Sequence, residues 1–206
     1  MRRSQLIQFL KTRSLLLSAV TVVPLVIVIL GLTACVKYPV GDPEKSKMDS
    51  QFVGIWLAEE ADGQDSFLVM VPYDSRTYFA KIMNYRKTQE EIAATQQIDC
   101  KAWLTPIGGQ TFITMEPLSG ANLAGVGEKF PYLVGKIRLV DGDLHLRLVD
   151  GNKSPARDAD NRGELEAAIA EHVDSESLYV DEPTVFKKTN DKPLIESVFR
   201  AFHQQL

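Results

Sequence analysis

The chain has 206 residues, of which 45% are hydrophobic and 24% charged, and its formal net charge at pH 7 is −4. Because the first 34 residues hold four basic side chains and no acidic ones, the 172 residues after them carry a net charge of −8. A chain of this length predicts one domain with a single core, and its acidic charge argues against binding to nucleic acid or to anionic lipid headgroups.

A basic segment, a long apolar run and a cysteine follow one another at the N-terminus. The apolar run spans residues 15–34, and the basic residues before it are Arg2, Arg3, Lys11 and Arg13. This order is typical of a signal peptide for export. The run closes with Leu32, Thr33, Ala34 and Cys35, which resemble the lipobox of bacterial lipoproteins. In that family the cysteine thiol receives diacylglycerol and becomes the new N-terminus after cleavage just before it.

This resemblance implies that residues 1–34 are a lipoprotein signal peptide and that Cys35 is the lipidation site, with no cofactor beyond this covalent lipid. Val36 follows the cysteine, where an aspartate would resemble the signal for inner-membrane retention. We therefore expect the outer membrane, facing the periplasm, in a Gram-negative cell, and otherwise the outer face of the cytoplasmic membrane. An uncleaved single-pass anchor is the alternative, because about 20 apolar residues also span a bilayer.

Residues 35–50 combine prolines, a glycine and mixed charges, and they predict a flexible tether after the lipidated cysteine. The domain proper, residues 51–190, opens with strand-like runs at 52–57, 66–73 and 77–86. Residues 87–97 switch to helix formers, and Thr88 and Glu91 have the spacing of a capping box, so this segment predicts a helix.

Two glycine-containing turns predict hairpins further along the chain. Gly108-Gly109 separates the strand-like runs 100–107 and 110–117, and Asp141-Gly142 separates 132–140 and 143–149. A helix is predicted over 163–172, before a last strand region in 178–188, and residues 191–206 end the chain as an amphipathic helix. We expect this last helix to pack on its own domain, with a partner groove as the alternative. The pattern predicts a mainly β fold: an antiparallel barrel or strongly curved sheet of about 7–8 strands.

Gly54-Ile55-Trp56 on the first predicted strand resembles the G-x-W signature of lipocalins and related barrels. The resemblance implies that Trp56 closes the barrel floor and that Gly54 leaves room for it. The chain departs from that family in lacking a Thr-Asp-Tyr motif and in placing a helix before the last strand. No arginine near the end of the barrel is a clear partner for Trp56, which leaves the remote Arg200 as the candidate. The hairpin at 103–112 is also similar to one in bacterial lipoproteins from which no activity carries over.

No group of residues in the sequence predicts catalysis or a metal site. His145, His172 and His203 are scattered, and Cys100 is expected to be buried on a strand. Residues 158–163 resemble the start of an EF-hand calcium loop, but Ile169 replaces the required glutamate, so they are expected to cap the following helix.

The sequence therefore predicts a non-enzymatic, membrane-tethered envelope lipoprotein. One version of this hypothesis has the barrel bind a small apolar ligand. The alternative is an interaction or assembly factor for envelope proteins, in which a protein partner takes the place of the ligand.

Overall fold

The computed structural model describes residues 35–59, 63–87, 92–118, 132–180 and 182–203. The chain divides into two compact units, Met1–Thr33 and Ala34–Leu206, and all described residues belong to the second. The predicted signal or anchor helix and the lipobox residues Leu32, Thr33 and Ala34 lie outside the described residues. Within the described part of the chain, no helix is long and apolar enough to cross a membrane.

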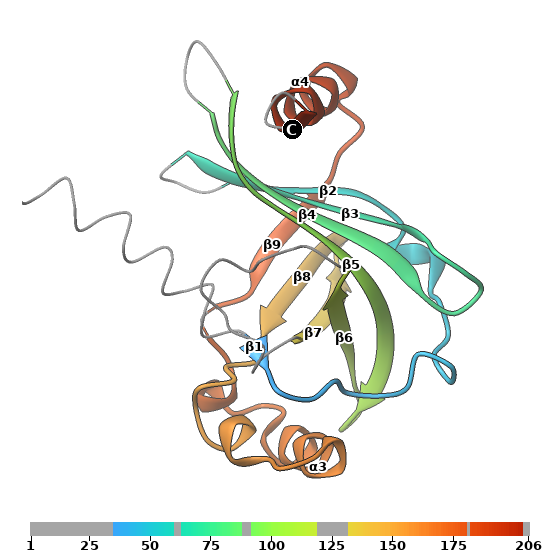
Figure 1. The fold of residues 1–206 in the computed structure, drawn as a ribbon, viewed down its shortest axis with the longest axis vertical. Helices are drawn as coiled ribbons and strands as arrows, with labels where there is room; N and C mark the ends of the chain where they lie inside the picture. The colour runs from blue at the N-terminus through green and yellow to red at the C-terminus, as the bar shows by residue number, and fades with distance from the viewer. Residues whose placement is uncertain (1–34, 60–62, 88–91, 119–131, 181, 204–206) are drawn as a thin grey trace, which may run out of the picture. The chain divides into compact units, whose positions relative to one another are not determined.

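Eight antiparallel strands close into a barrel (Figure 1). Each strand from β2 to β8 pairs with the next, and β9 pairs with both β8 and β2. A short extra strand, β1, pairs with β7. The predicted fold class is thereby confirmed. The bounds of the strands are Cys35–Val36 (β1), Gly54–Ala58 (β2), Gln64–Pro72 (β3), Tyr78–Lys87 (β4), Ile92–Ile107 (β5), Gln110–Pro117 (β6), Tyr132–Val140 (β7), Asp143–Leu148 (β8) and Thr184–Lys188 (β9).

Both predicted hairpin turns are confirmed at the predicted residues. Ile107 pairs with Gln110 across Gly108-Gly109, and Val140 pairs with Asp143 across Asp141-Gly142. All four turn residues have positive φ, from 53° at Asp141 to 91° at Gly142. A two-residue turn with positive φ at both positions matches the right-handed twist of the flanking strands. The local sequence therefore determines the register of two of the hairpins.

The prediction of a helix over residues 87–97 is wrong. Residues 92–97 form the first part of β5 and pair with β4, and the predicted cap, Thr88 and Glu91, lies outside the described residues. Ile92 and Ala94 pack in the cluster beneath the C-terminal helix. Pairing and packing with distant parts of the chain have outweighed the local helix propensity of this segment.

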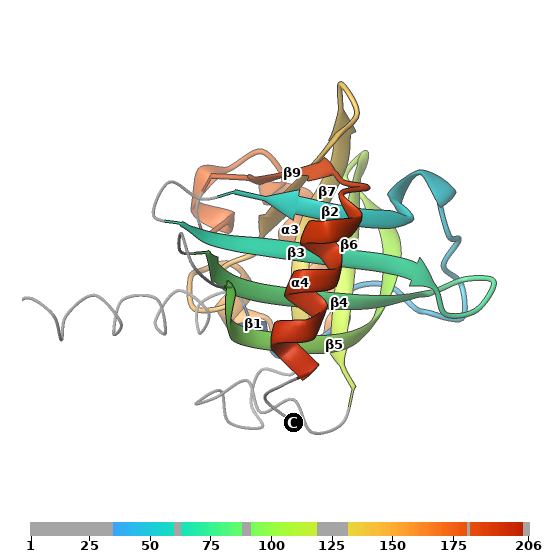
Figure 2. The same cartoon turned by 90° about the horizontal axis from the view of Figure 1, so that it is seen from above.

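The largest hydrophobic cluster takes buried side chains from all eight barrel strands and is the barrel interior. On the wall formed by β2 to β5, the alternate side chains point outward and meet α4, Lys192–His203, which lies across these strands in Figure 2. Val198 and Phe202 are buried in this contact. The C-terminal helix therefore packs on its own barrel, as predicted; residues 204–206 lie outside the described residues.

A second helix, α3 (Arg162–His172), comes before β9, as predicted, and packs on the outer side of β5 to β7. Leu165 and Ile169 are its buried residues. Three 3-10 turns complete the elements: η1 (Ser50–Phe52), η2 (Ala156–Asp158) and η3 (Glu176–Leu178). The last strand region is shorter than predicted, because Tyr179 forms only an isolated bridge with Val149 before β9 begins.

Residues 36–50, which the sequence analysis takes as a flexible tether, pack against the barrel instead. Val36 and Val40 are buried, and the carbonyl oxygen of Val40 accepts hydrogen bonds from Trp103 Nε1 at 2.8 Å and Thr114 Oγ1 at 2.9 Å. Ser46 Oγ donates to the carbonyl oxygen of Leu104 at 2.9 Å. This segment is a strap that packs on the barrel because its valines are buried and its backbone accepts hydrogen bonds from barrel side chains. Its prolines and glycine therefore mark turns of an ordered strap and not a flexible tether.

Candidate functional site

Cys35, the predicted lipidation site, is the first residue of β1 and pairs with Leu133 of β7. Its side chain is 1% exposed and belongs to the interior cluster of the barrel. Burial raises the pKa of its thiol to about 11. The unmodified cysteine is therefore held inside the domain as a poorly reactive thiol.

A glycine beneath β1 shows how closely this strand is packed. A Cβ atom at Gly151 would lie 1.8 Å from the carbonyl oxygen of Cys35 and 3.2 Å from Cα of Val36. These distances are well inside van der Waals contact. Only glycine at position 151 leaves room for β1 in this place.

The second cysteine, Cys100, is fully buried on β5, as predicted. Both cysteines are reduced, and both belong to the interior cluster. Burial raises the pKa of the Cys100 thiol to about 12, so it is a packing residue with little reactivity.

Gly54 and Trp56, the predicted barrel-floor residues, lie on β2 beside Lys188 of β9. Trp56 is 1% exposed, and its Nε1 donates a 2.9 Å hydrogen bond to the carbonyl oxygen of Phe52. The Nζ atom of Lys188 lies 5.1 Å from the centre of the Trp56 ring and donates to the carbonyl oxygen of Val53 at 2.9 Å. This arrangement is a cation–π contact between β9 and β2.

Gly54 is required by this arrangement for two reasons. Its φ of +153° is one that other residues rarely adopt, and a Cβ there would lie 2.7 Å from Cε of Lys188. The sequence analysis gave Arg200 as the candidate partner of Trp56. This prediction is wrong, because Arg200 lies on the exposed side of α4. Lys188 has this position because β9 pairs with β2 and brings Lys188 opposite Trp56.

Many side chains inside the barrel are fully buried. Eight members of the interior cluster are 0% exposed, which means that no water-sized space adjoins them: Met70, Tyr78, Ala80, Cys100, Ala102, Ile113, Met115 and Leu144. The hydroxyl of Tyr78 donates to the carbonyl oxygen of Asp49 at 2.9 Å, and the Trp56 N–H is bonded to Phe52. The polar atoms of these two aromatic side chains are thus satisfied by the chain's own backbone.

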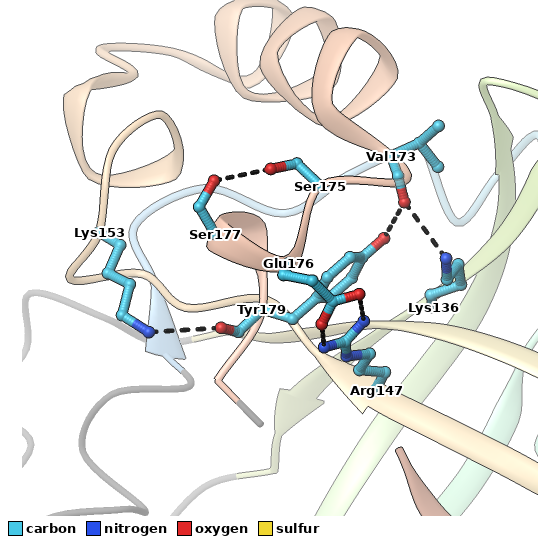
Figure 3. A network of polar contacts seen from close by, with 8 residues as sticks. All are labelled: Lys136, Arg147, Lys153, Val173, Ser175, Glu176, Ser177 and Tyr179. Atoms are coloured by element: carbon cyan, nitrogen blue, oxygen red, sulfur yellow. Dashed lines mark hydrogen bonds and ion pairs between the residues drawn. The ribbon is translucent and has the colours of Figure 1, made fainter. Parts of the chain in front are cut away.

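A polar network surrounds Tyr179 on the outside of β7 and β8 (Figure 3). Its ring lies 4.6 Å from the guanidinium carbon of Arg147 and 5.1 Å from Nζ of Lys136. The Tyr179 hydroxyl donates to the carbonyl oxygen of Val173 at 2.6 Å, and Lys136 donates to the same oxygen at 3.2 Å. Two nitrogens of Arg147 bind the two carboxylate oxygens of Glu176. The sequence analysis did not single out these residues, although Lys136 and Arg147 fall on the polar positions of a predicted hairpin.

The three histidines lie on separate elements, and the acidic loop caps α3 as expected. His145 lies on β8, whereas His172 and His203 are in the last turns of α3 and α4. In the loop, Asn161 caps α3 by accepting from the backbone N–H of Glu164 at 3.0 Å. Among the described residues, no three of His, Cys, Asp and Glu are grouped closely enough to hold a metal ion.

No protein-family model matches the chain, and no curated protein or solved structure is significantly similar to it. The case for a function therefore depends on the chain's own residues: Cys35, the closed barrel and the polar network outside it.

Proposed function

We propose that this chain is an exported protein that is anchored to a membrane through diacylglycerol on Cys35, and that its barrel is a non-catalytic domain displayed at the membrane surface. The observation that carries this proposal is the position of the domain boundary. The compact unit begins at Ala34, one residue before Cys35. Cleavage just before Cys35 would remove the preceding unit and leave the barrel and its strap complete.

Lipidation of Cys35 would displace β1 from its position beside β7. A thioether to diacylglycerol places two long acyl chains on Sγ, and this atom belongs to a cluster that side chains already fill. The lipidated cysteine therefore has to leave the barrel, which requires that the two pairs between β1 and β7 open. Only Cys35 and Val36 need to move, because the strap is held independently from Val40 onward by Trp103 and Thr114.

For the barrel itself, the packing of the interior favours display of a surface over transport of a small apolar ligand. A carrier of the lipocalin kind encloses its ligand in a cavity. Here the eight fully buried side chains in the middle of the barrel leave no such space beside them. An interaction with another component of the envelope, through the outer surface, fits this packing better.

The uncleaved single-pass anchor remains a second candidate, and the burial of Cys35 favours it. An unmodified Cys35 fits its place in the barrel with 1% exposure, so in this version the cysteine is a core residue and the apolar run before it holds the protein in the membrane.

Incorporation of a labelled fatty acid separates these two candidates. The full chain is expressed in its own host with an alkyne-tagged fatty acid, alongside the variants Cys35→Ser and Cys100→Ser. We expect label in the wild type and in Cys100→Ser, which is the matched control, and none in Cys35→Ser. An unlabelled wild-type protein in the membrane fraction would refute lipidation and support the uncleaved anchor.

A further inference from the structure

Four basic side chains line a hollow on the outside of the hairpin β7–β8. The hollow has a volume of about 60 Å³ and is lined by Lys136, Arg138, His145, Arg147 and Pro183. A cavity needs about 10–15 Å³ of water-accessible volume to hold one water molecule, so this space is large enough for a small oxyanion. No carboxylate is among these lining residues, although the chain as a whole is acidic.

The register of the hairpin puts these basic residues directly opposite one another. Lys136 pairs with Arg147 and Arg138 pairs with His145, all on the outward face of the two strands. Lys136 and Arg147 carry like charges at directly opposed positions, which destabilises a sheet. Mutual repulsion between clustered cations lowers the stability of the fold. Such a cluster is typical of a site where a bound anion offsets this repulsion.

The network around Tyr179 holds two of these cations in place. One aromatic ring contacts both Lys136 and Arg147, and the carbonyl oxygen of Val173 fixes the lysine ammonium group (Figure 3). Burial and then, in smaller measure, the neighbouring arginines lower the pKa of Lys136, while Asp174 and Glu176 oppose this effect. Lys136 and Arg147 are therefore held in place before any ligand arrives, which reduces the entropy that binding would cost.

Three carboxylates act on the cations of the hollow without lining it: Asp174 and Glu176 act on Lys136, and Glu176 and Glu182 act on Arg147. Glu176 binds Arg147, but it is 76% exposed and does not line the hollow. Arg138 lies on the exposed surface of β7. Its guanidinium group can offer a planar pair of N–H donors to an oxyanion, and Lys136 can add a point charge.

We propose that this hollow binds a phosphate group, with Arg138 and Lys136 as its main ligands and Arg147 supporting them. A phosphate monoester fits by size, by charge and by its oxygens, which accept from both kinds of donor. The group has two potential sources, a lipid headgroup in the membrane or a soluble phosphate compound. The overall acidic charge had argued against such ligands, but binding depends on the local potential of this face.

Titration of the full-length protein with inorganic phosphate tests the proposal. The protein is held in neutral maltoside micelles, and binding is measured by calorimetry at constant ionic strength. We expect saturable binding that is about tenfold weaker in Arg138→Gln, the effect of losing one charge-assisted contact. The matched control is Arg86→Gln, an exposed arginine on β4, which should bind as the wild type does. No binding, or equal binding by Arg138→Gln and the wild type, would overturn the proposal.

A second arm distinguishes the two sources of phosphate. The same titration is made with the protein in nanodiscs of phosphatidylcholine alone and of phosphatidylcholine with phosphatidic acid. If the anionic discs suppress phosphate binding, the site takes a headgroup; if phosphate binds equally in both discs, the site takes a soluble compound. Neither arm depends on how the N-terminus is anchored, so this test and the test of lipidation can fail separately.

Discussion

Replacing Gly151 with alanine should release Cys35 from the barrel. The new Cβ would lie 1.8 Å from the carbonyl oxygen of Cys35 and 2.7 Å from its carbonyl carbon. Both are backbone atoms, so the clash cannot be relieved by a rotamer change, and β1 has to move. Gly151 is not among the glycines with positive φ, so the alanine is not strained by its own backbone and the effect isolates the position of β1.

The size of the effect follows from the two side chains that β1 buries. Cys35 and Val36 are each 1% exposed in place. Burial of a valine side chain stabilises the folded state by about 1.5–3 kcal/mol, and burial of the smaller cysteine side chain contributes less. We therefore expect the free energy of unfolding to fall by about 2–3 kcal/mol. Since about 1.4 kcal/mol is a factor of ten, the fraction of molecules with an accessible Cys35 should rise roughly 30- to 150-fold.

Thiol alkylation followed by mass spectrometry measures this fraction. The unit from Ala34 to Leu206 is produced without the preceding residues, so that Cys35 stays a free thiol. Gly151→Ala should be alkylated at Cys35 much faster than the wild type, while Cys100 stays protected. Gly163→Ala, whose nearest neighbour would be the Asn161 side chain at 3.3 Å, is the control and should react as the wild type does. Equal rates at Cys35 in the wild type and Gly151→Ala would show that β1 does not dock as described.

Three further predictions concern the barrel and its covering helix. Phe202→Ala should lower the free energy of unfolding in urea by about 3–5 kcal/mol. The exposed Arg200→Ala should leave it nearly unchanged, and equal stability of the two variants would contradict packing of α4. Gly54→Ala should destabilise the domain by about 1–3 kcal/mol, because Lys188 Cε lies 2.7 Å from the new Cβ and the backbone there has positive φ. A neutral result in the same assay would argue against the described packing of Lys188 over Trp56. Native mass spectrometry should find no apolar ligand inside the barrel, and one non-covalent lipid per domain that stays bound in Arg138→Gln would refute a filled interior.

Local chemistry made the hairpins and the C-terminal helix predictable. Gly108-Gly109 and Asp141-Gly142 specify their turns through backbone conformation alone, so neighbouring residues are sufficient to place them. The apolar stripe of α4 likewise reports its buried face directly.

Long-range pairing explains what the sequence did not predict. Residues 92–97 have helix-forming composition but pair with β4, and Lys188 reaches Trp56 only because the barrel closes between its first and last strands. The burial of Cys35 depends in the same way on β7, almost 100 residues away along the chain. The basic face of β7 and β8 was present in the sequence as alternating charges, but its meaning depends on the strand register and on Tyr179.

The intact mass of the protein extracted from its own host's membranes tests the central claim most directly. The account predicts a chain that starts at Cys35 and carries the added mass of diacylglycerol on that residue. A chain that keeps the residues before Cys35, with an unmodified cysteine, would contradict it and would establish the N-terminal apolar run as the anchor.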